Sequence, residues 1–147
     1  MCAKSVTVKG VNDVLMSFRR YEMEVEKTIK DTVKEFMQKV MADALANLPH
    51  GSQYLRATFH IEVTDEGYTA WVYSDDELAA YVEFGTGIWA RAYLSGKPME
   101  MKVEAIKFFI NGKGTMFAQP YLFPAYYRYM GWFEPELKQR LDRIRVA

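Results

Sequence analysis

Few side chains in this sequence have the types and spacing that catalysis or metal binding needs. His50 and Ser52 are two of the groups that a serine hydrolase uses, but no nucleophile-elbow motif surrounds the serine and no third partner stands at a suitable position. The histidines His50 and His60, together with the single cysteine Cys2, do not make up a set of metal ligands. The sequence therefore predicts no catalytic residue, no metal site and no cofactor, and we do not expect an enzyme.

Two glycine-rich segments invite a phosphate-binding interpretation. Gly112-Lys113-Gly114-Thr115 has the composition of a P-loop, but Lys107 stands where the upstream glycine belongs, and a glycine replaces the hydroxyl residue after the lysine. Thr86 lies between two glycines and could hold a phosphate through backbone N–H groups, although so short a pattern is more typical of a turn. We therefore favour plain turns at both places.

Two further features could carry function, and each also has a structural explanation. Glu83 could serve as a catalytic carboxylate, but such a residue more often pairs with a base or accepts hydrogen bonds from backbone N–H groups. A cluster of C-terminal aromatic residues could stack nucleic-acid bases, but its helical spacing favours a role in a core and an interface. A nucleic-acid-binding module that uses this tyrosine-rich region is our alternative interpretation. The cluster comprises Tyr126, Tyr127, Tyr129, Trp132 and Phe133.

Composition narrows the possible partners. Lys and Arg together number 19, as do Asp and Glu, so the formal net charge is zero. A general nucleic-acid binder usually carries a basic surplus, whereas a near-neutral chain repels itself weakly and can self-associate.

The 147 residues, half of them apolar, suit one domain with a good core, which we place at 1–147. No apolar run is long enough to cross a bilayer, so no membrane partner is expected, and the lone cysteine suits a reducing cytoplasm.

The element that must organise the N-terminal third is a long amphipathic helix. Across residues 14–48 the apolar positions recur at steps of three or four, and Pro49 follows. A continuous helix of this length would extend roughly 50 Å, so a break near Tyr21–Glu22 is left open. Before the helix, the alternation at Val6–Val8 predicts a short strand.

A β-hairpin and a short helix should follow. Residues 58–73 alternate between apolar and polar on both sides of an Asp65-Glu66-Gly67 turn, which predicts a hairpin with one face in water. Ser74 and Glu77 have the spacing of a capping box, and Gly85 suits the end of a helix. We favour a short helix between them, with a strand as the second possibility because the same stretch also alternates.

The segment at about 88–116 is the least regular part, and we interpret it as a variable loop or hairpin insertion. Residues 107–110 and 115–117 would be its two strands, joined by a tight Asn111-Gly112 turn. Some of the residues before this hairpin could be helical instead.

The C-terminal region completes the predicted fold. Pro124 suits the first turn of a helix, which Gly131 and Pro135 would kink or interrupt. The whole pattern predicts an α+β fold in which a long N-terminal helical region and a C-terminal helix pack on a small, mostly antiparallel sheet.

Two motifs consist mainly of residues that shape the backbone. Their glycines permit positive φ and their prolines fix φ, so we expect them to build shape and not to do chemistry. The first motif comprises Tyr81, Val82, Glu83, Phe84, Gly85, Thr86 and Gly87, and the second comprises Gln119, Pro120, Tyr121, Pro124 and Ala125.

The two motifs in this order, within this succession of helix, hairpin and helix, resemble one known family. They are similar to the small neck proteins of long-tailed bacteriophages, also called head–tail joining or tail-completion proteins. The resemblance covers most of the chain. It departs at residues 50–53, where relatives commonly have Asp-Thr-Gly, and at Phe123, where a basic residue is common.

The resemblance implies a structural virion protein of a tailed phage or prophage, made in the cytoplasm of the host bacterium. Such a protein forms or completes a ring, commonly of six subunits, at the head–tail junction, beside connector and tail proteins. DNA passes through the lumen without sequence-specific binding. A closed ring needs head-to-tail interfaces, in which aromatic residues are favoured. Our candidate interface residues are Trp89, Tyr93, Phe108 and Phe109.

Overall fold

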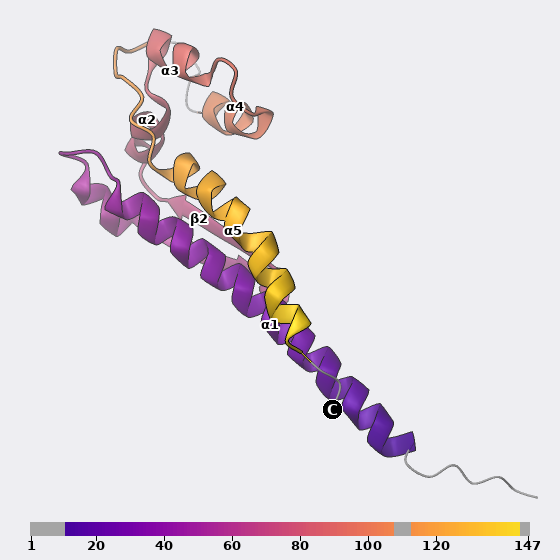
Figure 1. The fold of residues 1–147 in the computed structure, drawn as a ribbon. Coiled ribbons are helices and arrows are strands. Elements are labelled where there is room, and N and C mark those ends of the chain that lie inside the picture. Colours follow the sequence, from indigo (N-terminus) through magenta and orange to yellow (C-terminus); the bar gives the residue numbers. More distant parts are fainter. Residues whose placement is uncertain (1–10, 108–112, 145–147) are drawn as a thin grey trace, which may run out of the picture.

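The structure is a computed structural model that describes residues 11–107 and 113–144. The predicted strand at Val6–Val8 lies outside the described residues. Seven helical or strand elements and two short 3-10 turns follow one another in this part of the chain (Figure 1). They are α1 (Val11–Ala46), η1 (Gln53–Thr58), β1 (Phe59–Thr64), η2 (Asp65–Gly67), β2 (Thr69–Ser74), α2 (Leu78–Phe84), α3 (Gly87–Leu94), α4 (Met99–Ile106) and α5 (Leu122–Asp142).

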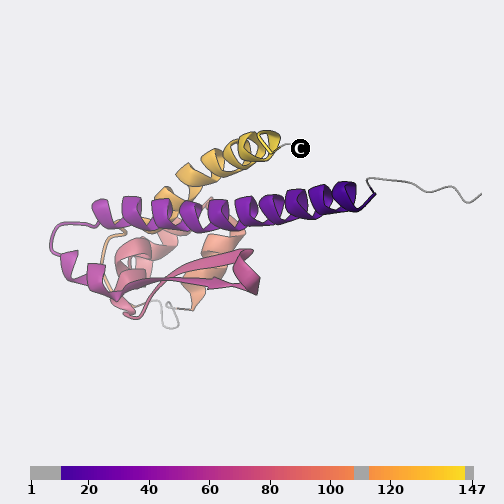
Figure 2. The same cartoon turned by 90° about the horizontal axis from the view of Figure 1, so that it is seen from below.

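Helix α1 is the backbone of the fold. It runs for 36 residues without the break that we left open near Tyr21–Glu22. Helix α5 lies antiparallel to it, because Arg128 near the start of α5 pairs with Asp43, whereas Arg140 near its end pairs with Glu35 at 2.6 Å. Figure 2 shows α1 as a middle layer, with α5 on one side and the hairpin on the other. The predicted packing of two long helices with a small antiparallel sheet is therefore confirmed.

The main core lies where these three layers meet. Aromatic rings from α1 and α5 interlock there, with the Phe36 ring centroid 5.2 Å from that of Phe133 and 5.9 Å from that of Tyr126. Aromatic pairs at this separation and tilt add to the stability that burial of apolar area supplies. The buried members are Phe36, Val40, Ala44, Leu45, Leu48, Leu55, Phe59, Ala79, Val82, Tyr121 and Ala125.

The hairpin is confirmed, with β1 and β2 antiparallel and Phe59 opposite Ser74. Its turn contains two non-glycine residues with positive φ, Asp65 at 53° and Glu66 at 55°. The hairpin packs on α1, and Phe59 and Ala70, which share one of its faces, are buried. The other face lies in water, as predicted.

The short helix after the hairpin is also confirmed, but its start differs from the predicted capping box. The Ser74 hydroxyl accepts a hydrogen bond from the Asp76 N–H at 3.1 Å, and the Asp76 carboxylate accepts one from the Leu78 N–H at 2.9 Å. Asp76, not Ser74, therefore supplies the side-chain oxygen at the start of α2. Gly85 ends the helix with φ of 76°, as the sequence predicted.

Helices α3 and α4 occupy most of residues 88–106, where we interpreted the sequence as an irregular segment but left a helix open before the hairpin. Met101 and Ala105, four residues apart, are buried against Phe84, and this packing favours a helix over a strand. No strand forms at 115–117, where the Met116 backbone bonds to Thr86 instead. Most of the first predicted strand and its turn, at 108–112, lies outside the described residues.

The last helix is not interrupted, so one of the two effects predicted for Gly131 and Pro135 is wrong. Helix α5 continues past Gly131 with Pro135 inside it. A proline clashes with the carbonyl group four residues earlier, which here belongs to Gly131, and both residues are exposed, so water can bond to that carbonyl oxygen. Residues on both sides of the proline hold the helix in place, since Phe133 packs on the core and Arg140 bonds to α1.

Candidate functional site

The carboxylate of Glu83 joins the two sequence motifs. Its side chain is buried, with 2% of its surface exposed, and it accepts hydrogen bonds from three backbone N–H groups. The donors are Tyr121 at 2.7 Å, Leu122 at 2.8 Å and Phe123 at 3.1 Å. These N–H groups belong to the first turn of α5, where a helix has no internal acceptors for them. Glu83 on α2 is thus a helix cap supplied by a residue about forty positions earlier in the chain.

The electrostatics of this contact between Glu83 and the start of α5 indicate a structural role for Glu83. Burial raises the pKa of the Glu83 carboxyl, and the three N–H donors oppose that effect by favouring the charged form. The positive end of the α5 dipole acts in the same direction as the donors. Because all three contacts are to backbone groups, the carboxylate is committed to positioning α5, as one of our two interpretations of this residue predicted.

The rest of the first motif clamps the chain segment that leads into α5. The Thr86 N–H donates to the Met116 carbonyl oxygen at 2.9 Å, and the Thr86 hydroxyl accepts from the Met116 N–H at 2.8 Å. One turn earlier, the Val82 carbonyl oxygen accepts from the Gln119 N–H at 2.8 Å. Thr86 therefore uses its N–H and its hydroxyl within the protein, which agrees with a turn and not with a phosphate site.

Glycine is required in the clamp because two backbones approach closely. A Cβ on Gly87 would lie 2.2 Å from the Gly114 carbonyl oxygen, and one on Gly85 would lie 2.7 Å from the Ala118 nitrogen. Both residues also have positive φ, 57° for Gly87 and 76° for Gly85. We call the set of contacts from Val82 to Gly87 with residues 114–123 the motif clamp.

The second motif contributes its buried residues to the same region. Tyr121 is buried, its ring packs edge-on against Phe59 at 5.9 Å, and its hydroxyl donates to the Ala79 carbonyl oxygen at 3.0 Å. Ala125 is buried in the main core, whereas Pro120 and Pro124 are exposed. The structure thus brings most residues of the two motifs together, where α2 meets the start of α5.

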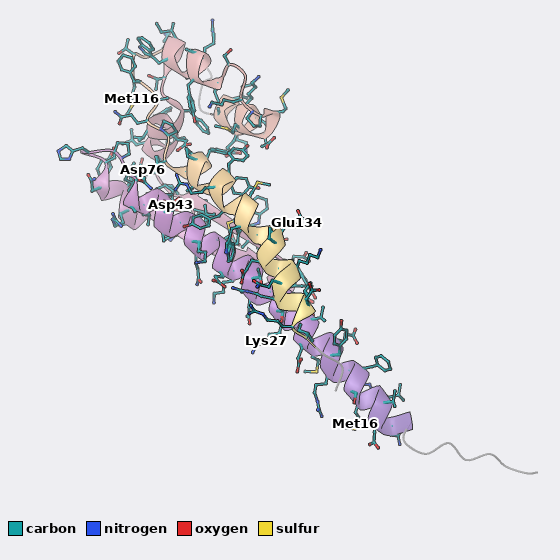
Figure 3. The ribbon with its side chains drawn as sticks, viewed as in Figure 1. Met16, Lys27, Asp43, Asp76, Met116 and Glu134 are labelled. Atoms are coloured by element: carbon teal, nitrogen blue, oxygen red, sulfur yellow. The ribbon has the colours of Figure 1, made fainter. Side chains whose placement is uncertain are left out.

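The structure describes two of the four candidate interface residues, Trp89 and Tyr93. Trp89 on α3 is partly exposed and lies against Phe117, with ring centroids 4.1 Å apart. Tyr93, one turn later, is half-buried, and burial raises its pKa to about 12. Phe108 and Phe109 lie outside the described residues. Trp89, Met116 and Phe117 form an exposed apolar surface that we call the α3 patch, and Figure 3 shows Met116 at the end of the molecule where α3 lies.

A second exposed apolar surface was missed by sequence reasoning. Residues 12–25 of α1, which we call the arm, extend beyond the other elements (Figure 3, Met16). The arm exposes Val14, Phe18 and Met23, with 55% of the Phe18 surface in water. The signal was present as the apolar stripe of the predicted amphipathic helix. Periodicity marks such a face, but it does not reveal whether anything covers it.

The remaining candidates for chemistry do not converge. His60 bonds to Asp75 on the surface, with 2.5 Å between Nε2 and the carboxylate oxygen, and His50 is exposed in the turn after α1. Within residues 11–107 and 113–144, no group of three or more His, Cys, Asp or Glu side chains could hold a metal ion. Of the aromatic residues that could have stacked bases, Tyr126, Tyr129, Trp132 and Phe133 pack against the main core, and Tyr127 packs against the second cluster around Phe84 and Met101.

Two shallow hollows lie near α3 and α4. The first, of about 320 Å³, has an almost wholly apolar lining that includes Tyr93, Phe123 and Tyr127. The second, of about 430 Å³, lies between α3 and α4 and includes Arg91 and Lys102. Both are open to solvent and hold no converging set of catalytic groups. None of the helices that the structure describes combines the length and apolar character needed to span a bilayer.

Comparison with known proteins agrees with this arrangement. No curated protein and no solved structure gives a significant match. The family described as "Bacteriophage HK97-gp10, putative tail-component" matches residues 12–85, half of the chain. The match begins at the arm, spans the hairpin and ends at Gly85, inside the motif clamp. The family's description is that of a phage structural component and not of an enzyme. Because the match covers half of the chain, the chain belongs to the HK97-gp10-like family of phage tail components.

Proposed function

We propose that this protein is a structural part of the virion of a tailed phage or prophage, located at the head–tail junction. There it forms or completes a ring through which DNA passes, and it contacts the neighbouring connector and tail proteins. It acts by recognition and has no catalytic role. Membership of the tail-component family gives the setting, and the α3 patch is the observation that carries the assembly role.

The α3 patch has the properties of a pre-organised contact surface. Phe117 has 59% of its surface exposed, yet its neighbour Met116 is fixed to Thr86 by two hydrogen bonds. Trp89 supports the Phe117 ring from α3. A rigid aromatic surface loses little conformational entropy on binding and is favoured at the centre of interfaces. In a closed ring this patch would meet a different surface of the next subunit.

The motif clamp gives the patch its support. Glu83 fixes the start of α5, and Thr86 with its flanking glycines fixes residues 114–117 against the start of α3. The motifs that carry the family resemblance therefore position the contact surface, while the contact itself falls on side chains next to them.

The test is assembly of the purified full-length chain, alone and with the connector and tail proteins of the same phage. Negative-stain electron microscopy and light scattering would give shape and mass over a range of concentrations. We expect rings, alone or on the connector or tail, and we expect Phe117→Ala to weaken their formation at unchanged thermal stability. Val63→Ala, which truncates another exposed apolar side chain, on the hairpin, is the control.

Two outcomes would contradict the proposal. If Phe117→Ala assembled as well as the wild-type chain, the α3 patch would not be the contact surface. If the chain bound none of its neighbours but bound DNA with strong salt dependence, the alternative of a nucleic-acid-binding module would be favoured.

A further inference from the structure

The arm presents an apolar face that is buried elsewhere along the same helix. Its apolar residues Val14, Phe18, Tyr21 and Val25 follow steps of four, three and four, and the stripe continues through Ile29 to Thr32 and Phe36. Thr32 and Phe36 are buried, because α5 and the core cover the stripe there. On the arm the same face is more open: Val14 and Phe18 are 53% and 55% exposed, whereas Tyr21 and Val25 are half-buried.

The place where this cover stops is well defined. Near its end, α5 contacts α1 through Arg140, which lies 3.4 Å from the Thr32 hydroxyl and 2.6 Å from the Glu35 carboxylate. On the other side of α1, the hairpin turn reaches Lys30, whose Nζ lies 5.0 Å from the centroid of the Tyr68 ring. Neither contact extends to the arm, which at 1.5 Å per residue projects about 20 Å further.

We infer that this open face binds the arm of a second copy of the chain, with the two arms antiparallel. The partner arm then lies on the line that α5 follows, on the same face of α1 and in the same antiparallel sense. The contact between α1 and α5 therefore continues across the pair. The pairing concerns the free chain and does not depend on the neck role proposed above.

The charged residues of the arm favour pairing with a second copy of the chain in the antiparallel orientation. The arm carries a basic pair, Arg19 and Arg20, followed by the acidic residues Glu22 and Glu24. In a parallel pair in register, like charges would face each other. In an antiparallel pair centred near Tyr21, the basic pair of each arm lies beside the acidic residues of the other, and Arg19 is placed beside the second copy's Glu22. Complementary charges flanking an apolar seam determine partner and orientation in paired helices.

Among the residues that the structure describes, none forms an ion pair with the charged residues that would make these contacts. These charged residues are Arg19, Arg20, Glu22 and Glu24, whereas Glu26, just beyond the arm, pairs with Lys30 at 3.0 Å. The seam is short, so we expect a weak dimer that depends on concentration. A two-fold pair uses the same surface on both copies and closes on itself.

A charge-reversal mixture tests the pairing directly. In Arg19→Glu alone, two glutamates face each other at each contact, and in Glu22→Arg alone two arginines do. When equal amounts of the two variants are mixed, each glutamate again faces an arginine. Analytical ultracentrifugation of the full chain should show a wild-type dimer, dimers about tenfold weaker in each variant alone, and recovery of the wild-type affinity in the mixture.

The mixture separates pairing from folding, because neither variant is changed by being mixed unless the two chains touch. Lys34→Glu is the matched control, since it reverses a charge on the exposed side of α1 outside the arm, and it should leave the dimer unchanged. Circular dichroism would verify that all variants keep their helix content.

Cysteine crosslinking gives an independent readout of the geometry. In a Cys2→Ser background, Tyr21→Cys lies near the two-fold axis and should form a disulfide-linked dimer on mild oxidation. Met16→Cys lies on the opposite side of the helix and should not. The inference is overturned if the wild-type chain is monomeric at every concentration, if mixing does not restore the dimer, or if Met16→Cys crosslinks as readily as Tyr21→Cys.

Discussion

Glu83 and Phe18 both lie on helices, but their surroundings differ completely. The Glu83 side chain is enclosed, and three backbone N–H groups from another helix bond to it. The Phe18 side chain has 55% of its surface in water, and the helix around it is held by its own backbone bonds. The motif clamp therefore owes its stability to contacts distant in sequence, whereas the arm depends on local helix propensity. Isolated helices as short as the arm are marginal in water, so the arm needs either the rest of α1 or a partner to stay ordered.

This difference between the motif clamp and the arm indicates which surfaces of the molecule can change conformation on binding. A surface that must be presented in one geometry, such as the α3 patch, is supported by buried polar contacts that tolerate little change. A surface that binds by pairing with another helix needs only an apolar stripe and matching charges. The predictions below test this contrast, beginning with the change of largest expected effect.

Removal of the Glu83 side chain should be the most damaging change. Glu83→Ala leaves three N–H groups at the start of α5 without their acceptor, and we expect a loss of about 3 kcal/mol or more in the free energy of unfolding. Urea unfolding followed by circular dichroism would measure it. Glu77→Ala, which removes an exposed carboxylate just before α2, the helix that carries Glu83, is the control and should change stability little. Equal stability of the two variants would mean that the bonds from Glu83 to the start of α5 do not stabilise the fold.

The next largest effect is expected at Gly87. An alanine there must adopt a φ of 57° and would place its Cβ 2.2 Å from the Gly114 carbonyl oxygen. We expect Gly87→Ala to cost about 2–4 kcal/mol, from backbone strain together with overpacking. Gly96 provides a matched control, because its φ is 74° but no atom lies within 4 Å of an added Cβ. Gly96→Ala should therefore cost only about 1 kcal/mol. Equal losses would exclude close backbone approach as the reason for Gly87.

A smaller effect should appear in the dependence of stability on pH. Burial raises the pKa of Glu83 in the folded chain above the ordinary value of 4.5, so the folded state holds the proton more tightly than the unfolded state. The contribution of Glu83 to stability is therefore greatest below pH 4.5 and decreases as pH rises through the folded pKa.

Subtraction of a variant that does not titrate isolates this effect. Glu83→Gln keeps the size of the side chain, so the unfolding free energy of the wild type minus that of the variant should fall as pH rises above 4.5. A difference that rises with pH would mean that the three N–H donors and the α5 dipole outweigh burial.

The smallest effect is expected in the arm. Phe18→Ala should change the unfolding free energy of the dilute monomer by less than about 0.5 kcal/mol, because the side chain packs on little. Phe36→Ala, on the same stripe but buried against Tyr126 and Phe133, should cost about 3–5 kcal/mol. Similar losses at the two positions would show that the arm is packed in solution.

Sequence patterns predicted the parts of this fold that repeat. The steps of three and four along α1 and the alternation of the hairpin identified both elements, because each period reflects one buried face. The helices at 88–106 were predicted only as a second possibility, since Gly96 and Pro98 divide the segment into two pieces too short to show a periodic pattern. Pro135 suggested a break in α5 that contacts with α1 prevent.

The site could be predicted only in part. The motifs marked Glu83 and Gly87 as residues that shape the backbone, but nothing in the spacing reveals that Glu83 caps a helix about forty residues later. Such a contact arises from the three-dimensional arrangement of α2 and α5. The openness of the arm likewise depends on where α5 ends relative to α1, which is a property of the packing.

Hydrogen exchange of the dilute full-length chain, followed by mass spectrometry, tests the central contrast most directly. Peptides that contain the N–H groups of Tyr121, Leu122 and Phe123 should exchange only with global unfolding, whereas peptides from residues 12–25 should exchange orders of magnitude faster. Equal protection of the arm and the motif clamp at concentrations too low for pairing would contradict the account, because it would mean that contacts within a single chain cover the arm.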